Sequence, residues 1–310
     1  MPESIKVFAP ATVANVSCGY DVLGFAVAHP GDEVIVHKKA AKGITIRKIT
    51  GDEGRLSLDP AKNTVSFSIL KFLEHYRLDT GFEITLHKKM PLGSGLGSSA
   101  ASSVAGLFAV NELLGSPFSK MELLPFAMEG ERLACGTAHA DNVAPALFGG
   151  FVLIRSYDPL DVIKINTPSK LFCTIIHPQI EVETKDARSI LPRQVLLKDA
   201  IVQWGNVAGL VAGLMSDNYE LIGRSMRDVI VEPRRAMLIP GFEKAKQAAL
   251  DAGALGGGIS GSGPSVFTLS KDEHTAKEAG KAMLKVFKQL NIAGEIYVSG
   301  INKAGPQVVG

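Results

Sequence analysis

The sequence predicts an α+β protein with two domains. The chain has 310 residues, which is enough for two hydrophobic cores. Apolar residues alternate in some segments, as in strands, and recur every three or four residues in others, as in helices. The second half runs strand, helices, strand, helix, strand, the order of an α+β sandwich. A turn at Ser156–Leu160 separates the halves, so we assign residues 1–157 and 158–310 to the two domains.

In the first domain, patterns of period two predict strands and patterns of period 3.6 predict helices. The segment 63–76 has the helical period, because Val65, Ile69 and Phe72 share one face. The segment 100–114 is apolar on nearly every side, so we expect a buried helix there. The expected strands are 5–9, 22–28, 34–36, 44–49, 82–87 and 151–155, and the expected helices are 63–76, 100–114 and 119–133.

The second domain repeats these signals at wider spacing. Its expected strands are 171–177, 266–269 and 295–299, and its expected helices are 202–215, 242–251 and 273–290. Residues after 299 are expected to form a disordered tail.

Composition narrows the class of protein. A net charge of +2 gives no reason to expect nucleic acid or an anionic membrane as partner. No apolar run is long enough to span a bilayer, and the first residues lack the pattern of a signal peptide. The three cysteines, Cys18, Cys135 and Cys173, fit neither a disulfide framework nor a zinc site. We therefore expect a cytoplasmic protein.

The segment Pro91–Ser102 carries the strongest chemical signal. Gly93, Gly95 and Gly97 stand at every second position, and two serines and an apolar helix follow. Glycine lets the backbone adopt positive φ and approach a ligand closely. The serines can cap the helix, whose first N–H groups and positive dipole end attract anions. We therefore expect the segment to hold phosphate groups.

The spacing excludes three common phosphate motifs. A Walker loop would end in Gly-Lys-Ser/Thr, but Gly97 is followed by serine. The dinucleotide fingerprint would need glycine where Ser98 stands. The lysine strand, HRD and DFG motifs of protein kinases are absent from the sequence. A flexible Gly/Ser linker is the structural alternative, but it would not lead directly into so apolar a helix.

Polar residues in other loops allow both a structural and a functional interpretation. Asn15 and Asp21 lie in the loop 10–21, where such residues commonly close turns. Glu129 and Glu131 lie near the C-terminal end of a helix and oppose its dipole. Each is a solvated carboxylate or has another task, such as holding a metal ion.

Two later segments and three arginines also allow both a structural and a functional interpretation. The segment His139–Gly150 groups His, Asp and Asn among small residues, which is typical of a binding loop, and no second histidine supports zinc. The glycine cluster 256–265 indicates a close approach of the backbone to a ligand or to the first glycine loop. Arg188, Arg234 and Arg235 are either solvated or placed to bind carboxylate or phosphate.

Taken together, these segments resemble the motifs of the GHMP kinases and, more closely, of the homoserine kinase family. The resemblance covers nearly the whole chain. It implies an N-terminal ATP-binding α/β domain with a left-handed βαβ unit, which is a rare handedness, and a C-terminal ferredoxin-like domain. The matching segments are 15–21, 91–102, 139–150, 184–188, 232–240 and 259–265.

The resemblance implies transfer of the ATP γ-phosphoryl group to the side-chain hydroxyl of L-homoserine, giving O-phospho-L-homoserine for threonine biosynthesis. Ser99 and Glu131 would hold Mg²⁺, a hard cation that prefers oxygen. A homodimer is also implied. The residues that would bind ATP are Pro91, Leu92, Gly93, Ser94, Gly95, Leu96, Gly97, Ser98, Ser99, Ala100 and Ala101.

The implied acceptor site matches an ammonium, a carboxylate and a hydroxyl. Asp21 and Asp141 would bind the ammonium, with Asn15 and His139 beside them, and Asn142 would orient the hydroxyl. Either Asp141 is a general base or the proton passes directly to the γ-phosphate. The residues expected to bind the acceptor are Asn15, Asp21, His139, Asp141, Thr184, Arg188, Arg235 and Gly261, of which Arg188 and Arg235 would bind the carboxylate.

Two other functions fit parts of the pattern. A kinase of the same fold could act on another small alcohol such as mevalonate, but mevalonate has no ammonium for Asp21 and Asp141. An inactive nucleotide-binding sensor would not need the poised metal ligands Ser99 and Glu131.

Overall fold

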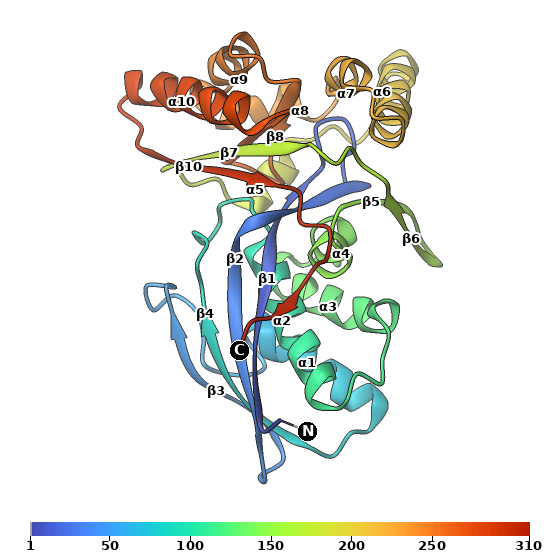
Figure 1. The fold of residues 1–310 in the computed structure, drawn as a ribbon, viewed down its shortest axis with the longest axis vertical. Helices are drawn as coiled ribbons and strands as arrows, with labels where there is room; N and C mark the ends of the chain where they lie inside the picture. Colours follow the sequence, from blue (N-terminus) through green and yellow to red (C-terminus); the bar gives the residue numbers. More distant parts are fainter. Residues whose placement is uncertain (1) are drawn as a thin grey trace.

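The computed structural model describes residues 2–310, except for the side chain of Cys135. Figure 1 shows two lobes stacked along the long axis, each built on one sheet. The first lobe contains β1–β6 and α1–α4, and the second contains β7–β10 and the remaining helices. The structure therefore confirms the expected two-domain α+β fold.

The first sheet has seven strands. Its order is β11-β1-β2-β4-β3, and β5 pairs with both β2 and β6. β3 and β4 are parallel and are joined through α1, which forms the βαβ unit, whereas the other pairs are antiparallel. The strands are β1 (Ser4–Ala14), β2 (Leu23–Lys39), β3 (Gly43–Thr50), β4 (Gly81–His87), β5 (Phe151–Tyr157), β6 (Leu160–Ile165) and β11 (Gln307–Val308).

Two strands are longer than expected, which shortens the first polar loop. The predicted strands 22–28 and 34–36 are a single strand, because β2 pairs with β1 on both sides of residues 27–30. A register shift between Pro10 and Thr12 lets β1 continue to Ala14. The loop expected at 10–21 therefore spans only residues 15–22.

Four helices cover one face of the first sheet (Figure 1). The central helix is α2, and all but three of its sixteen residues are buried, as its apolar sequence predicts. Its N-terminus points toward the junction between the domains. The helices are α1 (Thr64–Tyr76), α2 (Ser98–Leu113), α3 (Lys120–Cys135) and α4 (Ala140–Phe148).

The second sheet is antiparallel, with the order β10-β7-β9-β8. With helices between β7 and β8 and between β9 and β10, this is the expected ferredoxin-like arrangement. The first residues of the second glycine cluster form strand β8, which was not among the predicted strands. The strands are β7 (Phe172–Pro178), β8 (Gly256–Ile259), β9 (Val266–Ser270) and β10 (Gly294–Gly300).

Helices α9 and α10 lie on the side of this sheet away from the first domain (Figure 1). Helix α6 begins five residues earlier than predicted, and α9 has the predicted bounds. The helices of this half are α5 (Thr184–Ser189), α6 (Leu197–Met215), α7 (Tyr219–Ser225), α8 (Glu232–Arg235), the 3₁₀ helix η1 (Ala236–Leu238), α9 (Phe242–Asp251) and α10 (Glu273–Gln289).

The C-terminal tail is ordered, so the prediction of disorder was wrong. The amide of Gly150 donates to Asn302 O at 2.5 Å, and the amide of Asn302 donates to Ala26 O at 2.9 Å. Strand β11 then pairs with β1. The tail thus returns to the first domain. The expected boundary at residues 157 and 158 lies in the β5–β6 hairpin, and the chain enters the second sheet at β7.

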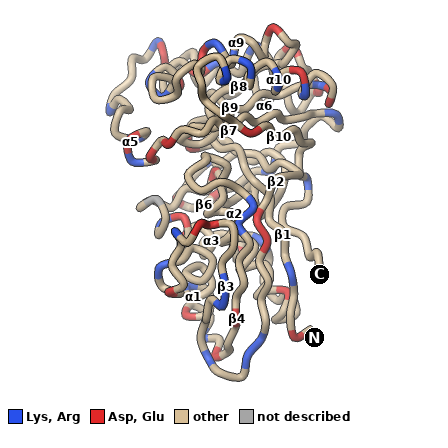
Figure 2. Tube along the Cα trace, turned by 90° about the vertical axis from the view of Figure 1, so that its left-hand side faces the viewer, with Lys and Arg blue, Asp and Glu red and all other residues tan. Residues whose placement is uncertain are grey.

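Surface charge and helix composition agree with the sequence. Figure 2 shows basic and acidic residues interspersed over both domains in that view. Within residues 2–310, every helix is too short or too polar to cross a bilayer.

Candidate active site

A cavity with a volume of about 460 Å³ lies between the two domains. That volume suits a small-molecule site. It brings together every residue expected to bind the acceptor or the metal, and all of the expected ATP-binding residues except Pro91, Ala100 and Ala101. Asn15 and Gly261, which are 246 positions apart in sequence, are hydrogen-bonded to each other here.

The glycine loop needs glycine for two different reasons. Gly93, Gly95 and Gly97 have φ values of +69°, +76° and +66°, a region that favours glycine. A Cβ at Gly97 would lie 2.0 Å from Thr12 Oγ1 and 2.8 Å from Asn142 Oδ1, whereas one at Gly93 would meet nothing within 4 Å. Glycine is therefore needed at position 97 for its positive φ and for the close contact with Thr12 and Asn142, and at position 93 only for its positive φ.

The serines after the loop do not cap α2, contrary to the prediction. Gly97 occupies the N-cap position and makes no side-chain bond. Ser98 Oγ instead donates to Asp32 at 2.9 Å, and Ser99 Oγ donates to Glu131. The first N–H groups of α2 are therefore left for a ligand, since no side chain competes for them.

A buried ion pair contacts the first turn of α2, directly after the glycine loop. Lys88 Nζ donates to Asp32, to Ser98 O at 2.9 Å and to Ser102 Oγ at 2.8 Å. Burial lowers the pKa of Lys88, although the charge of Asp32 opposes the shift. The sequence analysis missed this group. A lysine directly after a half-buried strand was its only signal, and Asp32 lies 56 positions away.

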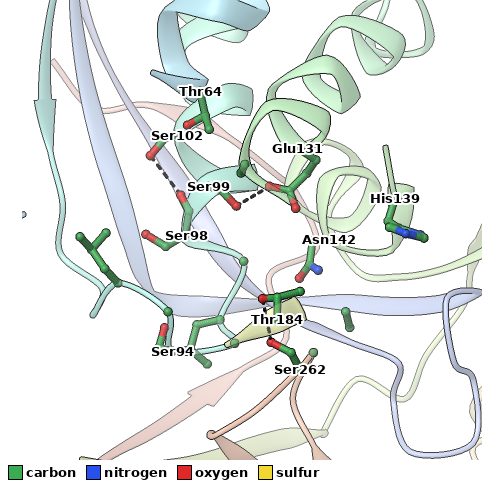
Figure 3. Close-up of a pocket in the computed structure, with 18 of the residues that line it drawn as sticks. Thr64, Ser94, Ser98, Ser99, Ser102, Glu131, His139, Asn142, Thr184 and Ser262 are labelled. Carbon is green, nitrogen blue, oxygen red and sulfur yellow. Dashed lines mark hydrogen bonds between the residues drawn. The ribbon is translucent and has the colours of Figure 1, made fainter. Parts of the chain in front are cut away.

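Ser99, in the first turn of α2, is hydrogen-bonded to Glu131 of α3. Figure 3 shows their side chains in direct contact, joined by a hydrogen bond, with Asn142 nearby. Glu131 is 6% exposed, and burial raises its pKa, although the hydrogen bond from Ser99 opposes this. Glu129 is paired instead with Arg132 at 3.2 Å on the surface. Glu131, and not Glu129, is therefore placed to bind a cation.

These two oxygens fit Mg²⁺. Within residues 2–310, no group of three or more His, Cys, Asp or Glu could hold a metal alone. Mg²⁺ is commonly held by one or two protein oxygens together with phosphates and water. The buried Glu131 carboxylate and the Ser99 hydroxyl are two such protein oxygens, and phosphates bound at the N-terminus of α2 would supply further oxygens.

The N-terminus of α4 brings Asp141 and Asn142 into the cavity. Thr12 Oγ1 donates to Asn142 Oδ1 at 2.7 Å, which orients the amide beside the glycine loop. Burial raises the pKa of Asp141 to about 7, and the charges of Asp21 and Glu131 add to this. Burial also lowers the pKa of His139, so that it is neutral near pH 7.

Asp21 pairs with Arg188 across the cavity. The Arg188 guanidinium approaches the two carboxylate oxygens at 3.2 and 3.5 Å, and His139 Nδ1 lies 3.7 Å from Asp21. The backbone oxygen of Asp21 accepts from Tyr157 Oη at 3.0 Å. Tyr157, which the sequence analysis placed in a turn, thereby fixes the loop.

Arg235 lies at the same end of the cavity. It is 3% exposed and donates to Gly261 O at 2.8 Å, which also accepts from Asn15 Nδ2 at 2.7 Å. The Tyr20 ring is 5.1 Å from the Arg235 guanidinium and 5.8 Å from that of Arg188. These contacts hold two guanidinium groups close together, which suits a carboxylate ligand.

The second glycine loop packs on the first, which answers the question left open by the sequence. Ser260 Oγ donates to Gly95 O at 2.7 Å. Thr184 Oγ1 and Ser262 Oγ lie 3.3 Å apart at the edge of the cavity, as Figure 3 shows. The loop therefore approaches both the first loop and the cavity.

The opposite end of the cavity contains residues that the sequence analysis did not single out. Leu56 and Leu133 make this end partly apolar. Asn63 caps α1 through its side chain and is thereby fixed in place. The additional lining residues here are Leu56, Lys62, Asn63, Thr64, Leu133 and Ala134.

Comparisons with known proteins agree with this geometry. Residues 63–150 match the GHMP kinases N-terminal domain, and residues 207–289 match the GHMP kinases C-terminal domain. Homoserine kinase from Chlorobium phaeovibrioides is 54% identical, covering 99% of this chain and 100% of that protein. Homoserine kinase from Xylella fastidiosa is 37% identical, covering 98% and 94%.

Solved structures give the same result. The crystal structure of homoserine kinase from Cytophaga hutchinsonii has a TM-score of 0.97 and 63% identity, covering 100% of this chain and 98% of that one. Mevalonate kinase from L. major has a TM-score of 0.70 at 16% identity, covering 96% of each chain, which is a likeness of fold alone. The chain belongs to the homoserine kinase family of the GHMP kinases.

Proposed function

We propose that this protein transfers the γ-phosphoryl group of ATP to the side-chain hydroxyl of L-homoserine, forming O-phospho-L-homoserine for threonine biosynthesis. One observation carries the proposal. A single cavity joins an anion-binding glycine loop to a group of two carboxylates and two guanidinium groups, Asp21, Asp141, Arg188 and Arg235. Homoserine presents the complementary ammonium and carboxylate beside a hydroxyl.

ATP would lie with its phosphates at the N-terminus of α2. The free N–H groups there and the positive dipole end stabilise anions. The base would lie toward Leu56 and Leu133, at the partly apolar end of the cavity. This orientation points the γ-phosphate toward Asn142, which Thr12 holds beside Gly97.

Ser99 and Glu131 would hold Mg²⁺. When bound, the ion neutralises phosphate charge and orients the phosphate oxygens. Ser99 orients the Glu131 carboxylate, and its hydrogen bond favours the ionised form against the effect of burial.

Asp21 and Asp141 would bind the ammonium of the acceptor. The charges that shift the pKa of Asp141 are those of Asp21, Glu131 and Arg188, so Asp141 lies near both the acceptor group and the proposed metal ligands. Asn142 lies between this group and the glycine loop and would hold the hydroxyl. The hydroxyl oxygen then forms a bond to the γ-phosphorus, the bond to the bridging oxygen breaks, and the proton passes to a γ-phosphoryl oxygen. Catalysis comes chiefly from positioning and charge.

Phosphorus NMR of the reaction products tests the proposal. With Mg²⁺, ATP and L-homoserine, we expect ADP and one phosphomonoester signal that coincides with authentic O-phospho-L-homoserine. Inorganic phosphate without a phosphomonoester would contradict the proposal. The homodimer and the cytoplasmic location stay predictions.

A further inference from the structure

Two buried side-chain oxygen atoms lie next to Asn15 and Arg235, two of the residues expected to bind the acceptor. Ser17 is 4% exposed and Glu232 is 9% exposed. Within the described part of the chain, neither Ser17 Oγ nor Glu232 Oε2 has a hydrogen-bonding partner. Such groups destabilise the fold unless a partner is supplied.

Both residues line one small cavity of about 10 Å³, together with Asn15, Asp228 and Arg235. The residues converge beside strand β8. A Cβ at Gly258 would lie 2.7 Å from Glu232 Oε2 and 3.4 Å from Ser17 Cα and Cβ. A side chain at Gly258 would therefore crowd the space between Ser17 and Glu232.

The other polar groups around the cavity are already engaged. Glu232 Oε1 accepts from Lys246 at 2.5 Å. Asp228 Oδ1 accepts from Gln203 Nε2 at 2.9 Å and from two backbone amides, and its Oδ2 accepts from the amide of Glu232 at 2.9 Å. Lys246 pairs with Glu232, and Gln203 and backbone amides satisfy Asp228, so a neutral ligand that both donates and accepts suits the cavity. One water molecule has the right size, about 10–15 Å³, and both donates and accepts.

We propose that this cavity binds one water molecule that joins Ser17 Oγ to Glu232 Oε2. Ser17 lies two residues after Asn15, and Glu232 lies three residues before Arg235. Asn15 and Arg235 both donate to Gly261 O. The water therefore links the two segments that supply acceptor contacts, and Ser17 and Glu232 are positioning residues. This consequence for the acceptor rests on the proposed function.

Steady-state kinetics test the positioning role. Ser17→Ala removes one partner of the water, and Gly258→Ala places a methyl group in its space. We expect each to raise the KM for homoserine about fivefold, the loss of one hydrogen bond, with an unchanged KM for ATP. The double variant should be no worse than the worse single variant, because both changes remove the same water. Additive effects, or an equal rise in the KM for ATP, would overturn the positioning role.

Ser270→Ala is the matched control, because Ser270 Oγ is also buried without a partner in the described chain but does not line this cavity. It should leave both KM values unchanged. Melting temperatures of all variants identify any that fail to fold.

A crystal structure of the full chain at about 1.5 Å resolution tests the water directly. We expect one ordered water within hydrogen-bonding distance of Ser17 Oγ and Glu232 Oε2, and none in Gly258→Ala. A direct bond between the two side chains, or a dry cavity, would overturn the inference. The water can be observed even if homoserine is not the acceptor, so the two proposals fail separately.

Discussion

Arg188 and Asp21 come from different domains and pair with each other in the cavity, with Arg188 Nη2 3.2 Å from Asp21 Oδ1. These are the two side chains proposed to bind opposite ends of the acceptor. A zwitterion can replace both partners at once, because its carboxylate neutralises Arg188 and its ammonium neutralises Asp21. A molecule with only one of these charges leaves a side chain unpaired. The ion pair thus discriminates against alcohols that lack either charge.

Replacing Asp21 tests this discrimination. We expect Asp21→Asn to raise the KM for homoserine about tenfold or more, since a charge pair of about 1.4 kcal/mol is lost. The ratio of kcat/KM for homoserine to that for 4-hydroxybutyrate, which lacks the ammonium, should fall, because Arg188 is released. Asp186→Asn, an exposed change on α5, is the control. An equal loss for both acceptors would refute the role of Asp21.

Glu131 and Glu129 offer a matched pair on one helix. Glu131→Gln should lower kcat/KM about 100-fold and raise the Mg²⁺ concentration needed for half-maximal rate, because the buried metal ligand is lost. Glu129→Gln should change neither, since Glu129 lies on the surface with Arg132. Rates measured over a range of Mg²⁺ concentrations separate the two. Equal behaviour of the variants would argue against Glu131 as a ligand.

Alanine variants at Gly97 and Gly93 distinguish the effect of backbone strain from the effect of a close contact with a neighbouring side chain. Both have positive φ, so alanine at either position costs about 1 kcal/mol of stability. Only Gly97→Ala also drives a Cβ against Thr12 and Asn142. We expect it to lower kcat/KM more than about 100-fold and Gly93→Ala to lower it far less. Comparable losses of activity at equal stability would show that the contact with Asn142 is unimportant.

A variant at Asp141 distinguishes between ammonium binding and general base catalysis as the role of this residue. Asp141→Asn is expected to raise the KM for homoserine about tenfold or more while kcat falls less. In the wild type, kcat/KM for homoserine should fall as the pH drops through about 7, where Asp141 takes up a proton. A large loss of kcat at unchanged KM would instead assign Asp141 as the base.

The raised pKa of Asp141 also affects stability. In the unfolded chain its pKa is 3.8, and in the folded protein it is about 7. The folded state therefore holds the proton more tightly, and stability is lost as the pH rises from about 4 to 7. The loss is at most about 4 kcal/mol, at about 1.4 kcal/mol for each pH unit. Asp141→Asn should thus melt at a higher temperature than the wild type at pH 8 and at a similar temperature at pH 4. A lower melting temperature at pH 8 would contradict the burial of a charge there.

Local signals made much of the site predictable. The glycine spacing located the anion loop, and the apolar sequence of α2 predicted its burial. Glu131 was noticed because a carboxylate near the C-terminal end of a helix opposes the dipole. The structure also shows that Glu131 is buried whereas Glu129 lies on the surface. This difference depends on which face of α3 is covered. Likewise, Arg235 is buried in the site whereas Arg234 is exposed.

Long-range pairings were out of reach of local signals. Asp21 and Arg188 are 167 positions apart, and no pattern in either segment specifies the other. Lys88 and Asp32 look like ordinary surface charges at the ends of strands. The order of the tail was not predicted because β11 is only two residues long and pairs with the distant strand β1, and because Asn302 is held by bonds with Gly150 and Ala26. Each of these features depends on a partner that only the fold brings close.

The most direct test of the central claim is the initial rate of ADP formation from Mg-ATP with L-homoserine, with mevalonate and without acceptor. The account predicts rapid ADP formation with homoserine and only background rates in the other two reactions. Mevalonate has a hydroxyl and a carboxylate but no ammonium, so it leaves Asp21 and Asp141 unpaired. A rate with homoserine no higher than the rate without acceptor would contradict the account.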